Sequence, residues 1–115
     1  MAYRVDIVLD QGSDYVCPFE FYDNARRPVN FNGFEAHMQV RRTASSTVIV
    51  DELSTEGEAP RLSFESNVLK AKWPRAITSA VKAGRYVYDL EVTEPGGGVK
   101  RLMEGAFVIK QEVTR

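Results

Sequence analysis

Cysteine and histidine are almost missing from this chain of 115 residues, which contains Cys17 and His37 and no other residue of either type. A single cysteine excludes an intrachain disulfide, so the fold does not depend on cross-links as many small secreted domains do. Zinc sites combine several cysteine or histidine ligands, so we expect no zinc. Loop carboxylates such as Asp10, Asp14 and Glu56 are candidates for calcium, but no EF-hand spacing joins them, so we expect no metal. Hydrolases with an activated serine or cysteine need a histidine base held against the nucleophile. The alternating pattern places His37, the single histidine, on a solvent-facing side of its strand, where a surface or interface role is expected. We expect no enzyme activity, no catalytic residue and no cofactor.

An excess of charge and long apolar runs are absent too. Fifteen Lys and Arg residues against sixteen Asp and Glu residues give a formal net charge of -1. Such a balance creates no general attraction for polyanions, so we expect no nucleic-acid partner. No apolar run approaches the roughly 20 residues of a membrane-spanning helix, and positions 1–6 lack a signal-peptide pattern. We therefore expect no membrane partner, no Sec-type export, and folding in a reducing compartment.

The residues that are present favour a single all-β domain over 1–115. Hydrophobic residues make up 43% and charged residues 27% of the chain, which is typical of a domain with one core. Runs of alternating polarity recur between turn-forming residues, a pattern typical of a β-sandwich with about seven to nine strands. The strands we expect cover 3–9, 15–22, 34–41, 47–53, 61–64, 68–73, 85–92 and 99–113. At most one short helical turn is expected, within 74–83.

Alternation is sharpest in 34–41, where apolar residues take every even position. Segment 85–92 alternates in the same way and is expected to form a central strand. In the second strand, Cys17 is expected in the core and Pro18, which has no N–H group, at a sheet edge or a β-bulge. Gly105 is a natural position for a β-bulge in the last strand. These patterns predict antiparallel sheets with one buried and one exposed face.

Several segments together resemble a family of small virion proteins of tailed bacteriophages. The segments are Gln11-Gly12, Pro28 to Arg41, Gly84 to Leu90, Glu104 to Ile109 and the ending Gln111 to Arg115. The chain departs from the commoner pattern at Phe31-Asn32, where Leu-Thr is frequent, and at Cys17-Pro18. The resemblance runs nearly from end to end, but turn and core residues carry it rather than a site.

The resemblance implies an immunoglobulin-like β-sandwich of the baseplate, neck or fibre-attachment type, with no catalytic residues. It also implies a virion protein that is assembled in the bacterial cytoplasm, and partners that are other tail, neck, fibre or capsid subunits. A symmetric homo-oligomer in the particle is expected, because virion subunits repeat by symmetry. We expect contacts through exposed strand and loop residues. The candidate interface residues are Glu35, His37, Gln39, Arg41, Arg42, Arg26, Arg27, Glu56 and Glu58.

Three other interpretations remain open from the sequence. A capsid decoration protein could use the same small β-domain. A carbohydrate-binding module could stack sugars on exposed aromatic rings of Tyr22, Phe31 or Trp73. An enzyme would need two carboxylates in one cleft, such as Asp89 with Glu91 or Glu104.

Overall fold

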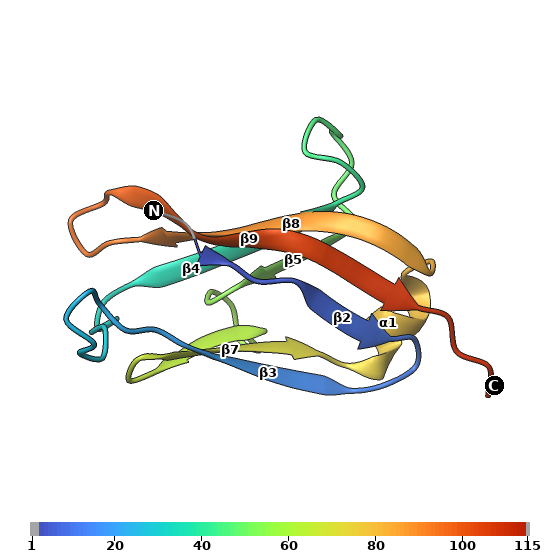
Figure 1. Cartoon of the computed structure of the whole chain (residues 1–115), viewed down its shortest axis with the longest axis horizontal. Helices are drawn as coiled ribbons and strands as arrows, with labels where there is room; N and C mark the ends of the chain where they lie inside the picture. Colours follow the sequence, from blue (N-terminus) through green and yellow to red (C-terminus); the bar gives the residue numbers. More distant parts are fainter. Residues whose placement is uncertain (1–2, 115) are drawn as a thin grey trace.

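Two β-sheets packed face to face form the molecule, as the computed structural model of residues 3–114 shows (Figure 1). The larger sheet has the order β1-β9-β8-β4-β5, and β2 also pairs with β9. The smaller sheet has the order β3-β7-β6. The elements are β1 (Tyr3–Arg4), β2 (Ile7–Asp10), β3 (Tyr15–Glu20), β4 (Glu35–Arg41), β5 (Asp51–Ser54), β6 (Leu62–Glu65), β7 (Val68–Trp73), α1 (Arg75–Ala80), β8 (Gly84–Thr93) and β9 (Val99–Lys110). The predicted all-β sandwich with one short helix is confirmed.

The topology is immunoglobulin-like. Strands β4, β8 and β9 take the places of strands C, F and G in one sheet, and β5 extends that sheet as C′ does in variable domains. Strands β3, β7 and β6 take the places of B, E and D in the other. One detail differs from the prediction, because β1 and β2 run parallel to β9. Local alternation carries no information about the direction of a distant partner strand.

The core lies between the sheets and follows the predicted alternation. In β4 the side chains of Ala36, Met38 and Val40 are buried while their neighbours face outward. Trp73 from the smaller sheet is 1% exposed, and its ring lies 5.6 Å from that of Phe107 in the larger sheet. The apolar faces of both sheets therefore close on one another, which is the main stabilising contribution in a fold of this kind.

Strand β3 lies at the edge of the smaller sheet, as Pro18 predicted, and its only described strand partner is β7. A proline blunts such an edge because it offers no N–H group to an incoming strand. Cys17 is half-buried against the core, and this burial raises the pKa of its thiol. Both features indicate a structural role for this segment.

The β-bulge of the last strand lies at Leu102 and not at Gly105, so that prediction was wrong. Leu90 pairs with Met103 while Glu91 pairs with Arg101, which leaves Leu102 as the extra residue. Glycine is needed at position 105 because of close packing and not because of a bulge. A Cβ atom there would lie 2.2 Å from the carbonyl oxygen of Val5. The break between β1 and β2 passes directly over this glycine.

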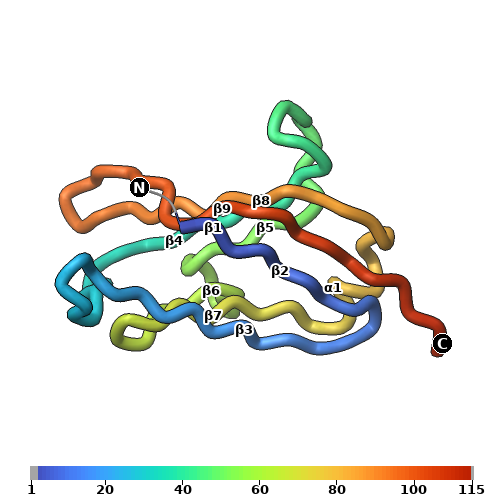
Figure 2. The backbone as a smooth tube through the Cα atoms, viewed as in Figure 1, coloured from blue at the N-terminus to red at the C-terminus, as the bar shows by residue number. Residues whose placement is uncertain are grey.

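The predicted strand over 47–53 is also partly wrong, because β5 begins at Asp51. Residues 42–50 form a loop that rises above the larger sheet (Figures 1 and 2). Val48 is 67% exposed and Ile49 is 41% exposed, so neither residue finds an apolar surface to cover it. β-Branched residues favour strands, but a strand also needs a partner and a buried face.

Tyr86 forms a tyrosine corner at the start of β8. Its buried side chain donates a hydrogen bond of 2.5 Å from the hydroxyl to the carbonyl oxygen of Lys82. We expect Tyr86→Phe to lower the free energy of unfolding by about 1 kcal/mol, the usual net value of one hydrogen bond. Urea denaturation measures this change. The matched control is Tyr22→Phe, whose hydroxyl binds Glu20 at the surface, and an equal loss in both variants would contradict the assignment.

Candidate functional site

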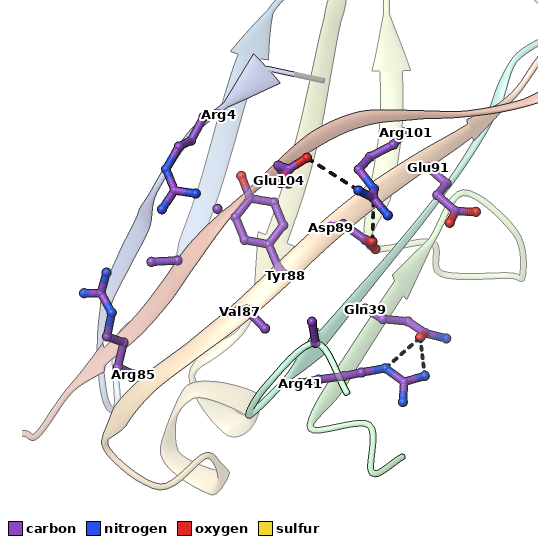
Figure 3. Close-up of a pocket in the computed structure, with 13 residues that line it drawn as sticks. Arg4, Gln39, Arg41, Arg85, Val87, Tyr88, Asp89, Glu91, Arg101 and Glu104 are labelled. Carbon is purple, nitrogen blue, oxygen red and sulfur yellow. Dashed lines mark hydrogen bonds and ion pairs between the residues drawn. The ribbon is translucent and has the colours of Figure 1, made fainter. Parts of the chain in front are cut away.

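The outer face is the surface of the larger sheet that points away from the smaller sheet, over strands β9, β8 and β4. Alternation places Arg85, Val87, Asp89 and Glu91 of β8 on this face, because Tyr86, Tyr88, Leu90 and Val92 point into the core. Here the sheet forms a shallow depression of about 440 Å³ (Figure 3). It is an open surface rather than a closed cavity.

Strand register arranges the outer face in rows that cross the strands. The row at Val87 has Arg41 on one side and Ala106 on the other. The next row along β8 is Asp89, between Gln39 and Glu104. Carboxylates therefore concentrate toward one end of the face, while Arg41 and Arg85 lie toward the other end.

Arg101 neutralises part of the acidic end. Its Nε atom lies 3.4 Å from a carboxylate oxygen of Asp89, and its Nη1 atom lies 3.6 Å from one of Glu104 (Figure 3). Arg41 instead hydrogen-bonds the side chain of Gln39 and the backbone oxygen of Ser46. Within the described part of the chain, neither Arg41 nor Arg85 forms an ion pair with a carboxylate.

Glu52 of β5 joins this face through two hydrogen bonds. The same oxygen, Oε2, lies 2.8 Å from Nε2 of Gln39 and 2.7 Å from Nε2 of His37. The hydrogen bond from Gln39, followed by the one from His37, holds the pKa of the Glu52 carboxyl below its usual value. Because the folded-state pKa is lowered, the stability from this carboxylate is present above the unfolded-state pKa and is lost as the pH falls through the folded-state pKa.

We expect Gln39→Ala to raise the pKa of Glu52 toward its ordinary value, since the largest cause of the shift is removed. Carboxyl carbon chemical shifts followed against pH by NMR measure the change. Glu65 is the internal control, because its pKa is lowered by Lys70 on the other sheet and should stay where it is. An unchanged Glu52 pKa in this variant would show that the amide is not responsible.

The structure brings some predicted interface residues together and separates others. Glu35, His37, Gln39 and Arg41 all face outward from β4, as predicted. Glu56 lies beside them, since it lines the same depression as Glu35 and His37.

Arg42, Arg26, Arg27 and Glu58 do not belong to the outer face. The guanidinium of Arg42 lies 5.1 Å from the centre of the buried Tyr86 ring, which is a cation–π contact. Arg26 and Arg27 lie in the loop between β3 and β4, at the opposite end of β4 from Arg41 (Figure 1). Glu58 lines a separate depression with Trp73. Adjacency in the sequence grouped the basic pairs, but the strand β4 keeps them apart.

The outer face also contains residues that were not predicted as part of it. The missed residues are Arg4, Arg85, Val87, Asp89, Glu91, Arg101 and Glu104. Alternation in 85–92 already placed four of these on an open face, so that signal was available. The sequence did not indicate that Arg4 lies at this face, because its position depends on the parallel pairing of β1 with β9.

Comparisons with known proteins find solved structures of similar shape but no relative by sequence. No protein-family model matches the chain, and no curated protein matches it. A structure of the extracellular domains of the voltage-gated sodium channel beta4 subunit, described as a parallel homodimer, is 11% identical with a TM-score of 0.44, covering 98% of this chain and 96% of that one. A structure from a photo-crosslinking study of sodium channel beta subunits is 14% identical with a TM-score of 0.38, covering 95% and 92%.

A third structure, extracellular domains 3–5 of Drosophila OTK, is 13% identical with a TM-score of 0.31, covering 93% of this chain and 32% of that one. Likeness at this level does not indicate a shared function. The assignment of the fold rests on strand order and register, and the account of the site rests on its own geometry.

Two carboxylates of the outer face are bound to one arginine. The guanidinium of Arg101 contacts both Asp89 and Glu104, and the surface around them is open. Among residues 3–114, no three His, Cys, Asp or Glu side chains are grouped so that they could hold a metal ion. No helix in this part of the chain is long and apolar enough to cross a bilayer.

A sugar-stacking platform is not formed by the aromatic residues proposed for it. Trp73 is 1% exposed and Phe31 is 4% exposed, so their rings lie in the core. Tyr22 is exposed, but one ring does not make a platform. The outer face therefore remains the strongest candidate for function.

Proposed function

We propose that this protein is a non-enzymatic structural protein of a tailed-bacteriophage particle. Its role is that of an adaptor or fibre-attachment subunit at the tail or neck, and it acts through protein contacts of the outer face. The resemblance of the sequence to small virion proteins supports a location in the phage particle. The geometry of the larger sheet supports the outer face as the contact surface.

One observation carries the proposal: the segments that bear the resemblance fold next to one another. Segments 28–41, 84–90 and 104–109 include all of β4, the first part of β8 and the second half of β9. These three strands are neighbours in the larger sheet and build the outer face. The segments that bear the resemblance therefore include outward residues such as Gln39, Arg41 and Asp89 together with the core residues between them.

Two further resembling segments clamp the end of the sandwich. The side chain of Gln11 donates to the backbone oxygen of Val81 and accepts from the backbone N–H of Glu112. Gly12 has φ of +78°, and a Cβ atom there would lie 2.2 Å from the Glu112 carboxylate. These contacts tie the turn after β2 to the residues after β9, which suits a subunit that must hold a fixed geometry in a particle.

The test is incorporation of single-site variants into particles. We expect Arg41→Ala to lower the number of copies per purified particle about tenfold, the change that corresponds to about 1.4 kcal/mol of binding. Arg42→Ala is the matched control, because its guanidinium contacts Tyr86 and not the outer face. Quantitative mass spectrometry of purified particles gives the copy numbers. If the natural chain is absent from the particles, the proposed function is wrong.

A further inference from the structure

We propose that the outer face binds the outer face of a second copy of this chain, in a symmetric dimer with its two-fold axis in the plane of contact and across the strands. The inference rests on the proposed function in that it names the partner of the same surface. Three observations carry it: the order of charges along β8, the set of charges left without a partner, and the loop above the face.

Charge changes sign along the outward residues of β8. The order is Arg85, Val87, Asp89 and Glu91, so one strand has a basic end and an acidic end. Arg41 lies beside Val87 and adds to the basic end. A surface with this polarity is complementary to itself once one copy is turned end to end.

The two-fold axis follows from that polarity. An axis across the strands, between the rows of Val87 and Asp89, places Arg85 of each copy opposite Glu91 of the other. The same ion pair then forms twice. An axis along the strands would instead bring acidic ends together, and like charges placed opposite one another are unfavourable.

The charges that this arrangement uses are those without a partner in the monomer. Asp89 and Glu104 are already bound to Arg101. Arg85 and Glu91 have no ion-pair partner among residues 3–114. They lie at opposite sides of the depression and are free to meet a second copy (Figure 3).

One exposed apolar residue, Val87, lies beside the proposed two-fold axis, and the 42–50 loop forms the rim of the contact. Val87 is 37% exposed, and the axis places it opposite Asp89 of the other copy, whose charge Arg101 already balances in part. The 42–50 loop rises above the outer face at its basic end, and Ala44 of this loop lines the depression (Figures 1 and 2). In the dimer each loop lies beside the acidic end of the other copy. Burial of Val48 and Ile49 there would add an apolar contribution to the charge pairing.

Charge reversal and its rescue test the dimer with the full chain. By sedimentation velocity at low ionic strength we expect the natural chain to dimerise. Arg85→Glu and Glu91→Arg should each raise the dissociation constant at least about tenfold, since each creates two repulsive contacts. The double variant should restore dimerisation, because every repulsive pair becomes attractive again. Raising the salt concentration should weaken the natural dimer, as screening requires.

Lys72→Glu is the matched control, because Lys72 is exposed on the smaller sheet and should not affect association. Far-ultraviolet circular dichroism confirms that each variant is folded. A natural chain that stays monomeric at every attainable concentration overturns the proposal, and so does a double variant that fails to recover. If the chain is monomeric in solution and is still found in particles, the dimer proposal is wrong and the proposed function stands. A dimer that is absent from particles overturns the proposed function and leaves the dimer standing.

Discussion

Replacing Asp51 with alanine should lower the free energy of unfolding by about 3 kcal/mol, the lower part of the range for breaking a buried ion pair, because it leaves the partly buried guanidinium of Arg61 without its counter-charge. The side chain of Asp51 is 8% exposed, and both of its oxygens lie 2.8 Å from nitrogen atoms of Arg61. The indole N–H of Trp73 donates to the same carboxylate at 3.1 Å. Arg61 also donates to the backbone oxygens of Glu52 in β5 and Lys72 in β7, so it joins the two sheets.

Urea denaturation, followed by the fluorescence of Trp73, measures this loss. Asp51→Asn is a milder second variant, since it keeps an acceptor for the indole while removing the charge. The control is Glu65→Gln, which breaks an exposed ion pair with Lys70 and should change stability little. Equal losses in Asp51→Ala and Glu65→Gln would mean that the pair between Asp51 and Arg61 does not tie the sheets together.

Gly105→Ala is expected to destabilise the fold by about 3 kcal/mol, the upper part of the usual range for overpacking a buried site. The added methyl group would lie 2.2 Å from the backbone oxygen of Val5, which cannot move freely. That oxygen accepts a hydrogen bond of 2.5 Å from the hydroxyl of Tyr88, and Asp6 binds the backbone N–H of Ala106. Displacing the first strands therefore breaks both bonds at once.

Thermal and urea unfolding give the magnitude, and hydrogen exchange at the amide of Ala106 reports the local change. Gly96→Ala is the matched control: an added Cβ atom there meets nothing within 4 Å, so stability should stay within about 0.5 kcal/mol. If Gly105→Ala is as stable as that control, the close approach of Val5 is not a constraint on the fold.

Much of the fold could be predicted because alternation is a local property of strands. The buried and exposed faces of 34–41 and 85–92 follow directly from side-chain polarity, and so does the hairpin of β6 and β7 around Ser66. The pairing of β1 and β2 with β9 could not be predicted, since it joins the two ends of the chain. Gly105 shows the same limit, because its neighbour Val5 is one hundred positions away.

The candidate site was predicted in part for the same reason. The outward residues of β4 were identified from one strand at a time, and Arg42 was included because it follows Arg41 in sequence. The neighbours of β4 in the sheet, and with them Arg85 and Glu91, required the register between strands. A surface built from three strands becomes visible only when their order is known.

A reconstruction of the intact particle is the most direct test of the central claim, that the outer face is the working surface of a virion protein. The account predicts symmetric copies of the sandwich at the tail or neck, with the outer face over β9, β8 and β4 covered by protein. If the copies lie on the capsid with that face covered, the proposed location at the tail or neck is wrong, but the outer face is still the contact surface. Copies whose outer face is open to solvent, or a particle without the chain, would contradict the account.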